Sequence, residues 1–71
     1  MADNETLGRL EEAAERIAGV HGTGVQDHEM KDGRWIVSIE TEDWAVTGTG
    51  FSKAEALSDL IKEAKGTGRA S

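Results

Sequence analysis

The stretch GTGFSKAEAL at residues 48–57 joins a strand-like segment to a helix-like one and organises the second half of the chain. Ser52 and Glu55 have the S-x-x-E spacing of a capping box, in which the two side chains accept hydrogen bonds from backbone donors at a helix start. Apolar residues then recur at spacings of three and four, and Gly66 follows as the expected C-cap. The pattern predicts a helix over residues 53–65. Its expected apolar face consists of Ala54, Leu57, Ile61 and Ala64, with Leu60 beside them.

A second amphipathic helix is expected near the N-terminus, over residues 4–18. Asn4 has a side chain that suits the N-cap, and Gly19 and Gly22 are expected to end the helix. The residues that share its apolar face are Leu7, Leu10, Ala14 and Ile17. Each helix therefore has one apolar stripe, which has to be covered by the segment between them.

The dipeptide Asp32-Gly33 predicts a hairpin in that middle segment, because both residues tolerate the positive φ of a two-residue turn. Such a turn places Met30 opposite Trp35. It also fixes which side chains of the two strands share a face, since the side chains of a strand alternate with a period of two.

A second tight turn, at Thr41-Glu42, is expected to pair the middle strand with a third one. It places Gly48 opposite Trp35, where the glycine leaves space for the indole. The apolar face that results consists of Met30, Trp35, Val37, Ile39, Trp44 and Val46. The opposite face, expected to be solvated, carries the acidic residues Asp27, Glu29, Glu40 and Asp43.

The sequence thus predicts an α+β fold in the order α-β-β-β-α. We expect a three-stranded antiparallel sheet with both helices packed on one face, the face that carries the two tryptophans. One domain is expected over residues 1–66, followed by a disordered tail at residues 67–71.

Composition excludes several classes of protein. The 71 residues suffice for one small core, and no apolar run approaches the roughly 20 residues of a membrane span. The chain has no cysteine, so it has no disulfide framework, and we expect a reducing, cytoplasmic setting. Eight Lys and Arg stand against 14 Asp and Glu. The formal net charge of -6 opposes unaided binding to nucleic acids or anionic membranes.

The order of elements and the corner at residues 48–57 resemble the double-stranded RNA-binding domain family. That family also has an α-β-β-β-α order, and a G-x-G-x-S-K-K motif leads into its second helix. Gly48, Gly50, Ser52 and Lys53 match the motif. The resemblance implies a fold with both helices on one face of the sheet.

The same motif argues against RNA binding by this chain. Members that bind RNA begin this helix with three lysines that straddle the phosphates. This chain has Lys53, but Ala54 follows it and Leu57 stands where the third lysine is expected. The loop of the first hairpin, KDGR at residues 31–34, lacks the Gly-Pro-x-His element of the family. We therefore expect no useful affinity for double-stranded RNA.

A second resemblance is to HicB-type antitoxin domains. In that family, strands that end in a glycine lead through a Ser/Thr or acidic cap into a helix that opens with EAL. Residues 35–64 follow this order, although HicB domains usually begin with a strand rather than a helix. The partner of such a domain is a protein toxin, so the resemblance implies a protein-binding role.

No catalytic, metal or cofactor site is expected. The two histidines are His21 and His28, and the acidic neighbours of His28 on a strand would point to the opposite face. His21 lies in the glycine-rich segment 19–24, and the chain has no G-x-S-x-G motif or phosphate-binding loop. Trp35 and Trp44 are expected in the core rather than on a base-stacking surface.

Size, charge and the lack of a catalytic set favour a small acidic, non-enzymatic module that binds or regulates another protein, and a phage or mobile-element origin fits such a protein. We expect a partner with a basic surface, and an open sheet edge could also pair two copies of the chain. The residues expected to contact the partner are Asp27, Glu29, Glu40, Glu42 and Asp43. The alternative is a nucleic-acid-binding module, which would use Lys31, Arg34 and Lys53.

Overall fold

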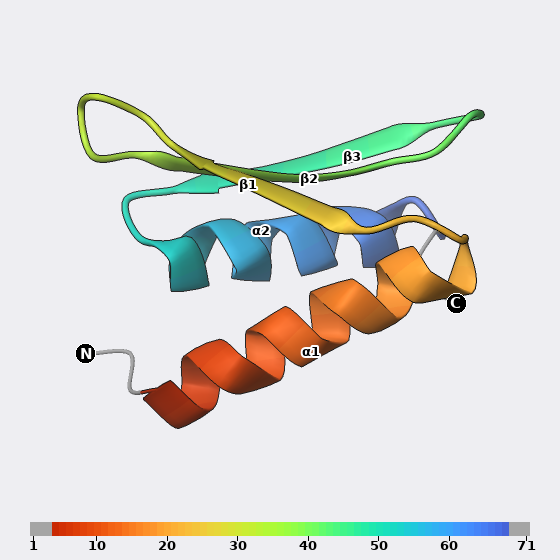
Figure 1. Ribbon diagram of the computed structural model, residues 1–71, viewed down its shortest axis with the longest axis horizontal. Helices are drawn as coiled ribbons and strands as arrows, with labels where there is room; N and C mark the ends of the chain where they lie inside the picture. The colour runs from red at the N-terminus through yellow and green to blue at the C-terminus, as the bar shows by residue number, and fades with distance from the viewer. Residues whose placement is uncertain (1–3, 69–71) are drawn as a thin grey trace.

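The computed structural model describes residues 4–68 and has one layer of helices beneath one sheet (Figure 1). The sheet is antiparallel, with strand order β1-β2-β3 and both helices on the same side. The predicted fold class is therefore confirmed. The elements are α1 (Asn4–Val20), β1 (Val25–Glu29), β2 (Trp35–Glu40), β3 (Ala45–Gly50) and α2 (Lys53–Gly66).

Strand β3 and helix α2 approach so closely that only glycine fits between them. A Cβ on Gly48 would overlap the backbone of Ala56 and lie 2.7 Å from Leu60 Cα. A Cβ on Gly50 would lie 2.5 Å from Glu55 Cβ. The expectation that Gly48 makes room for Trp35 is wrong, because Gly48 lies opposite Val37 and its open face is filled by the backbone of α2.

The start of α2 is fixed by the predicted capping box. Ser52 Oγ accepts a hydrogen bond from the Glu55 backbone N–H at 3.1 Å. The Glu55 carboxylate accepts one from the backbone N–H of Phe51 at 3.2 Å, one residue earlier than the usual box. The two bonds hold the strand-to-helix corner in place.

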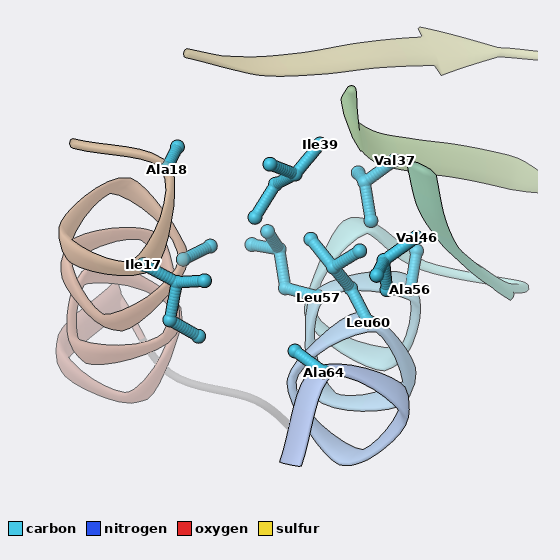
Figure 2. Close-up of a cluster of buried hydrophobic side chains, with 10 residues drawn as sticks. Ile17, Ala18, Val37, Ile39, Val46, Ala56, Leu57, Leu60 and Ala64 are labelled. Carbon is cyan, nitrogen blue, oxygen red and sulfur yellow. The ribbon is translucent and has the colours of Figure 1, made fainter. Parts of the chain in front are cut away.

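The core lies between the sheet and the two helices. In Figure 2, Val37 and Ile39 point from the sheet toward Leu57 and Leu60 of α2. Ala56 is fully buried, whereas Ala54 and Ile61, expected on the core face, are only half-buried, so the face is rotated from the predicted one. The buried set is Ala14, Ile17, Ala18, Val37, Ile39, Val46, Ala56, Leu57, Leu60 and Ala64.

Helix α1 packs mainly against α2 and touches the sheet only lightly, at β1. Figure 1 shows it nearest the sheet at its C-terminal end and diverging toward its N-terminus. The helix ends at Val20, so Gly19 lies inside it and does not end it as expected. Gly22 follows with a φ of 74°, and Thr23 N–H donates to Ala18 O at 2.9 Å, so the expected stop at Gly22 does close the helix end. The side chain of Asn4, the expected N-cap, lies outside the described residues.

The first hairpin differs from the predicted one by one residue. Its loop is Lys31–Gly33: Gly33 N–H bonds Met30 O at 3.0 Å, and Gly33 has a φ of 91° while Asp32 keeps a negative φ. This is the three-residue loop in which one glycine takes the left-handed conformation. Trp35 therefore lies opposite Glu29 and not Met30, and every side chain of β1 is turned to the other face.

The second hairpin turns at Glu42-Asp43 rather than at Thr41-Glu42, since the Thr41 hydroxyl accepts hydrogen bonds from the N–H groups of Asp43 (3.2 Å) and Trp44 (3.1 Å). Trp35 lies opposite Gly50 as a result. This shift is two residues, so the alternation is preserved. The predicted inward-facing residues Val37, Ile39 and Val46 are indeed buried.

The two tryptophans lie at opposite ends of the sheet and are half-buried, packed against the core without being part of it. The ring of Trp44 meets that of His21 edge to face, with 4.9 Å between centroids and 87° between planes. The end of α2 also differs from the prediction, because Thr67 is the C-cap and Gly66 still belongs to the helix. Of the tail expected at 67–71, residues 69–71 lie outside the described residues.

A substitution at Gly48 tests the contact between β3 and α2. Gly48→Ala should lower the free energy of unfolding by about 3 kcal/mol, since the added methyl meets backbone atoms that no side-chain rotation can move. Gly8→Ala is the control: Gly8 lies on α1 with nothing within 4 Å of a Cβ, and this change should stabilise by about 0.5–1 kcal/mol. Urea unfolding measures both, and wild-type stability in Gly48→Ala would contradict the contact.

Candidate functional site

The five carboxylates expected to contact a partner fall into two groups. Asp27 and Glu29 lie on β1, and the corrected register turns them to the helix side of the sheet. Glu40, Glu42 and Asp43 lie at the end of β2 and in the following loop. That loop lies beside Val25, at the start of β1, because Val25 pairs with Ile39. The single acidic face expected from the sequence is therefore wrong.

The β2–β3 loop and the α1–β1 loop enclose an open hollow of about 510 Å³. His21 and Trp44 form one wall, through their edge-to-face contact. The residues lining it are His21, Gly22, Thr23, Glu40, Thr41, Glu42, Asp43 and Trp44. The sequence placed His21 in a connecting loop and the acidic residues in a solvated turn, and only the sheet register brings the two together.

Lys53, the one lysine that matches the RNA-binding motif, is engaged within the domain. Its Nζ lies 3.1 Å from Asp27 Oδ2 and 4.0 Å from Glu11 Oε1, and 6.0 Å from the centroid of the Trp35 ring. The hydrogen bond to Asp27 raises the pKa of Lys53, partial burial opposes that change, and the charge of Glu11 adds to it. A phosphate would have to compete with these carboxylates.

The cations of the first hairpin loop are arranged differently. Arg34 Nε lies 2.8 Å from Asp32 Oδ2, and the Arg34 backbone N–H donates to Asp32 Oδ1 at 3.1 Å. That backbone hydrogen bond holds the pKa of Asp32 below its usual value. Lys31 beside them is exposed. Of the three cations proposed for nucleic acid, two are thus paired with carboxylates of this chain.

An open hollow of about 610 Å³, lined by apolar and polar side chains, lies where the first hairpin loop meets the β3–α2 corner. Phe51 on its rim is 75% exposed, although it is the one phenylalanine of the chain. Trp35 and Met30 are half-buried beside it. The full lining is Met30, Arg34, Trp35, Ile36, Thr49, Gly50, Phe51 and Glu55. Sequence analysis did not single out Phe51, although a phenylalanine between a strand end and a helix cap belongs to no buried face.

Residues 4–68 contain no cluster of three or more histidine or acidic side chains arranged to hold a metal ion. Within the same range, neither helix combines the length and the apolar character that crossing a membrane requires. His21 and His28 lie apart, the first at the end of α1 and the second on the open face of β1.

Comparisons with family models, curated proteins and solved structures find no match to this chain. The observed α-β-β-β-α order is compatible with the resemblance to double-stranded RNA-binding domains. Membership of that family, or of the HicB-type antitoxins, has no support beyond the order of elements and the short corner motif.

The pairing of Lys53 with Asp27 gives a titration test. Asp27→Asn should move the pKa of Lys53 back toward its usual value, because the hydrogen bond to Asp27 is the main cause of the increase. The pair stabilises the fold while Lys53 is charged, and this contribution is lost as the pH rises through the raised pKa, in the range above about 10. NMR titration of the Lys53 side chain measures it. Glu63→Gln, on the far part of α2, is the control, and an unchanged Lys53 pKa in Asp27→Asn would contradict the assignment.

Proposed function

We propose that this protein is a non-enzymatic binding module that docks onto another protein through the hollow beside the exposed Phe51. One observation carries the proposal: the largest exposed apolar side chain of the described residues lies on the rim of a hollow whose wall is formed by Trp35 and Met30. Aromatic side chains and methionine are enriched in the cores of protein interfaces.

The polar surroundings of the hollow support the same role. Arg34 and Glu55 also line it and are exposed, so the hollow combines apolar and charged side chains, as protein interfaces do. The backbone at Phe51 is fixed, since its N–H donates to Glu55 Oε1 at 3.2 Å. A backbone that is already ordered loses less entropy when a partner covers it.

The acidic surface supports a partner with a basic surface. A net charge of -6 attracts such a partner and accelerates the encounter. Glu40, Glu42 and Asp43 remain the proposed acidic contact residues at the loop end of the sheet. The lack of cysteine supports a cytoplasmic location for the protein. The small size and acidic composition fit a phage or mobile-element origin.

Truncation of Phe51 tests the proposed docking surface. Phe51→Ala should weaken partner binding by about 2 kcal/mol, the loss typical of an aromatic anchor, and change the stability of the free protein by less than about 0.5 kcal/mol. Val20→Ala is the matched control, because Val20 is 64% exposed and lies at the end of α1, outside the lining of the hollow. Pull-down from source cells with the three forms, followed by calorimetry with the recovered protein, measures the effect. Equal binding by wild type and Phe51→Ala would refute the proposal.

The nucleic-acid alternative has less support, since Lys53 and Arg34 are paired with Asp27 and Asp32. We expect no micromolar binding to an RNA duplex of about 20 base pairs, longer than the roughly 16 base pairs such a domain spans. Anisotropy titration at low salt measures this. Micromolar affinity that weakens with salt and disappears in Lys53→Glu would restore the RNA-binding interpretation.

A further inference from the structure

The two edges of the sheet are treated differently by the rest of the fold. Along β3, the outward N–H of Thr49 donates to Asp59 Oδ2 at 3.1 Å. The N–H of Phe51, just beyond the strand, donates to Glu55 Oε1 at 3.2 Å. Two carboxylates of α2 thus occupy successive donors that an added strand would need, and the C-terminal end of this edge is protected against strand addition.

The edge of β1 has no such protection in residues 4–68, and no strand lies beyond it there. The Met30 N–H donates to Arg34 O at 2.7 Å, so the backbone N–H of Met30 points toward β2. Backbone direction alternates along a strand. The N–H and C=O groups of Val25, Asp27 and Glu29 therefore point away from β2, toward the open edge.

The helix side of β1 is also uncovered. Only Val25 of this strand is half-buried, and the other residues are exposed, because α1 packs on α2 and diverges from the sheet. A groove of about 130 Å³ remains between α1, β1 and the start of α2. Its lining residues are Glu11, Glu15, Val25, Asp27, Lys53 and Leu57.

Charge in this groove is strongly unbalanced. Glu11 and Glu15 lie four residues apart on the face of α1 that borders β1, and Asp27 lies across from them. Glu29 continues the row on β1, because it is the next residue on the helix side. The lining thus holds three carboxylates against one cation, Lys53, and Glu29 adds a fourth carboxylate just beyond it.

We propose that the open edge of β1 binds an extended, basic segment of a partner protein, which adds to the sheet as a fourth strand. Lysine or arginine at alternate positions of that segment faces the carboxylates of β1 and α1, while its backbone pairs with Val25, Asp27 and Glu29. Alternate residues of a strand lie about 6.8 Å apart on one face, so cations at alternate positions of the segment stay in step with Asp27 and Glu29. The inference rests on the proposed protein-binding role and adds the chemical class of the partner.

Charge complementarity favours this occupant over a second copy of the chain. Two β1 edges paired antiparallel about Asp27 would place that carboxylate opposite its own copy, and Val25 opposite Glu29. Like charges directly opposite one another destabilise a strand pair. A basic segment replaces this repulsion with charge-assisted contacts.

A synthetic peptide in which lysine alternates with threonine is the probe, and a peptide of the same composition with its lysines clustered at the two ends is the control. NMR titration of labelled protein should show shifts at the amides of residues 25–29 and none at residues 45–50. The alternating peptide should bind at least about tenfold more tightly than the clustered one. Equal affinity would mean attraction by charge alone and would overturn strand addition.

Backbone methylation makes the test stricter. Strand addition uses the N–H groups of every second peptide residue. One peptide therefore carries N-methyl groups on the backbone amides of its lysines, and a second carries them on those of its threonines. Only one of the two should lose binding, and which one it is shows whether the added strand runs antiparallel or parallel to β1. If both methylated peptides bind, or if neither does, strand addition is wrong.

Two double variants with equal charge loss separate the groove from the overall charge. Asp27→Asn with Glu29→Gln should weaken peptide binding at least about tenfold, whereas Glu12→Gln with Glu63→Gln, two exposed residues outside the groove lining, should change it less than about twofold. Similar losses in both would overturn the assignment to β1. If the free protein instead self-associates as its concentration rises, and its amide NMR signals shift at residues 25–29, the occupant of the β1 edge is a second copy of the chain and the proposed basic segment is wrong.

The outcome is independent of the Phe51 test. Phe51→Ala should bind the alternating peptide as wild type does, because Phe51 adjoins the opposite edge of the sheet. If the peptide fails to bind while capture of a partner still depends on Phe51, only the strand-addition inference is lost. If peptide binding holds while Phe51→Ala has no effect on partner capture, only the docking surface at Phe51 is lost.

Discussion

Backbone contact between β3 and the first turns of α2 is the constraint on which the rest of the structure depends. Gly48 and Gly50 face α2 from one side of the strand, about 6.8 Å apart, where Gly48 meets Ala56 and Leu60 and Gly50 meets Glu55 in the first helical turn. The cap at Ser52 sets where that turn begins. Because backbone meets backbone, the helix cannot slide along the strand, and Leu57 and Leu60 are carried under the sheet.

The elements that the sequence predicts well are those defined by neighbouring residues. The start of α2 follows from a side chain three residues from its backbone partner, and the helices follow from periodic apolar residues. Sheet register depends on a smaller difference. Asp32-Gly33 suits both a two-residue and a three-residue loop, and the choice turns on whether Asp32 adopts a positive φ. One residue of error there moved Asp27 and Glu29 to the wrong face of the sheet.

The candidate surfaces were less predictable, because each joins segments that are distant in sequence. Glu11 and Lys53 are separated by most of the chain, yet both line the groove beside β1. His21 and Trp44 meet because β1 and β3 flank the same central strand. The exposure of Phe51 could have been predicted from the sequence, since the residue lies between a strand and a helix cap and belongs to no buried face. The count of charged residues predicted that the surface is negatively charged, but it did not predict where on the surface the charges lie.

The loose attachment of α1 has a consequence for the native ensemble. This helix shares its apolar stripe chiefly with α2, while β3 and α2 are joined by backbone contact and side-chain caps. Cooperative units with fewer buried contacts open at a lower free energy than the whole domain. Helix α1 is therefore expected to open at a lower free energy than the rest of the domain, and such an opening would expose Ile17, Ala18 and the side of Leu57 that faces them.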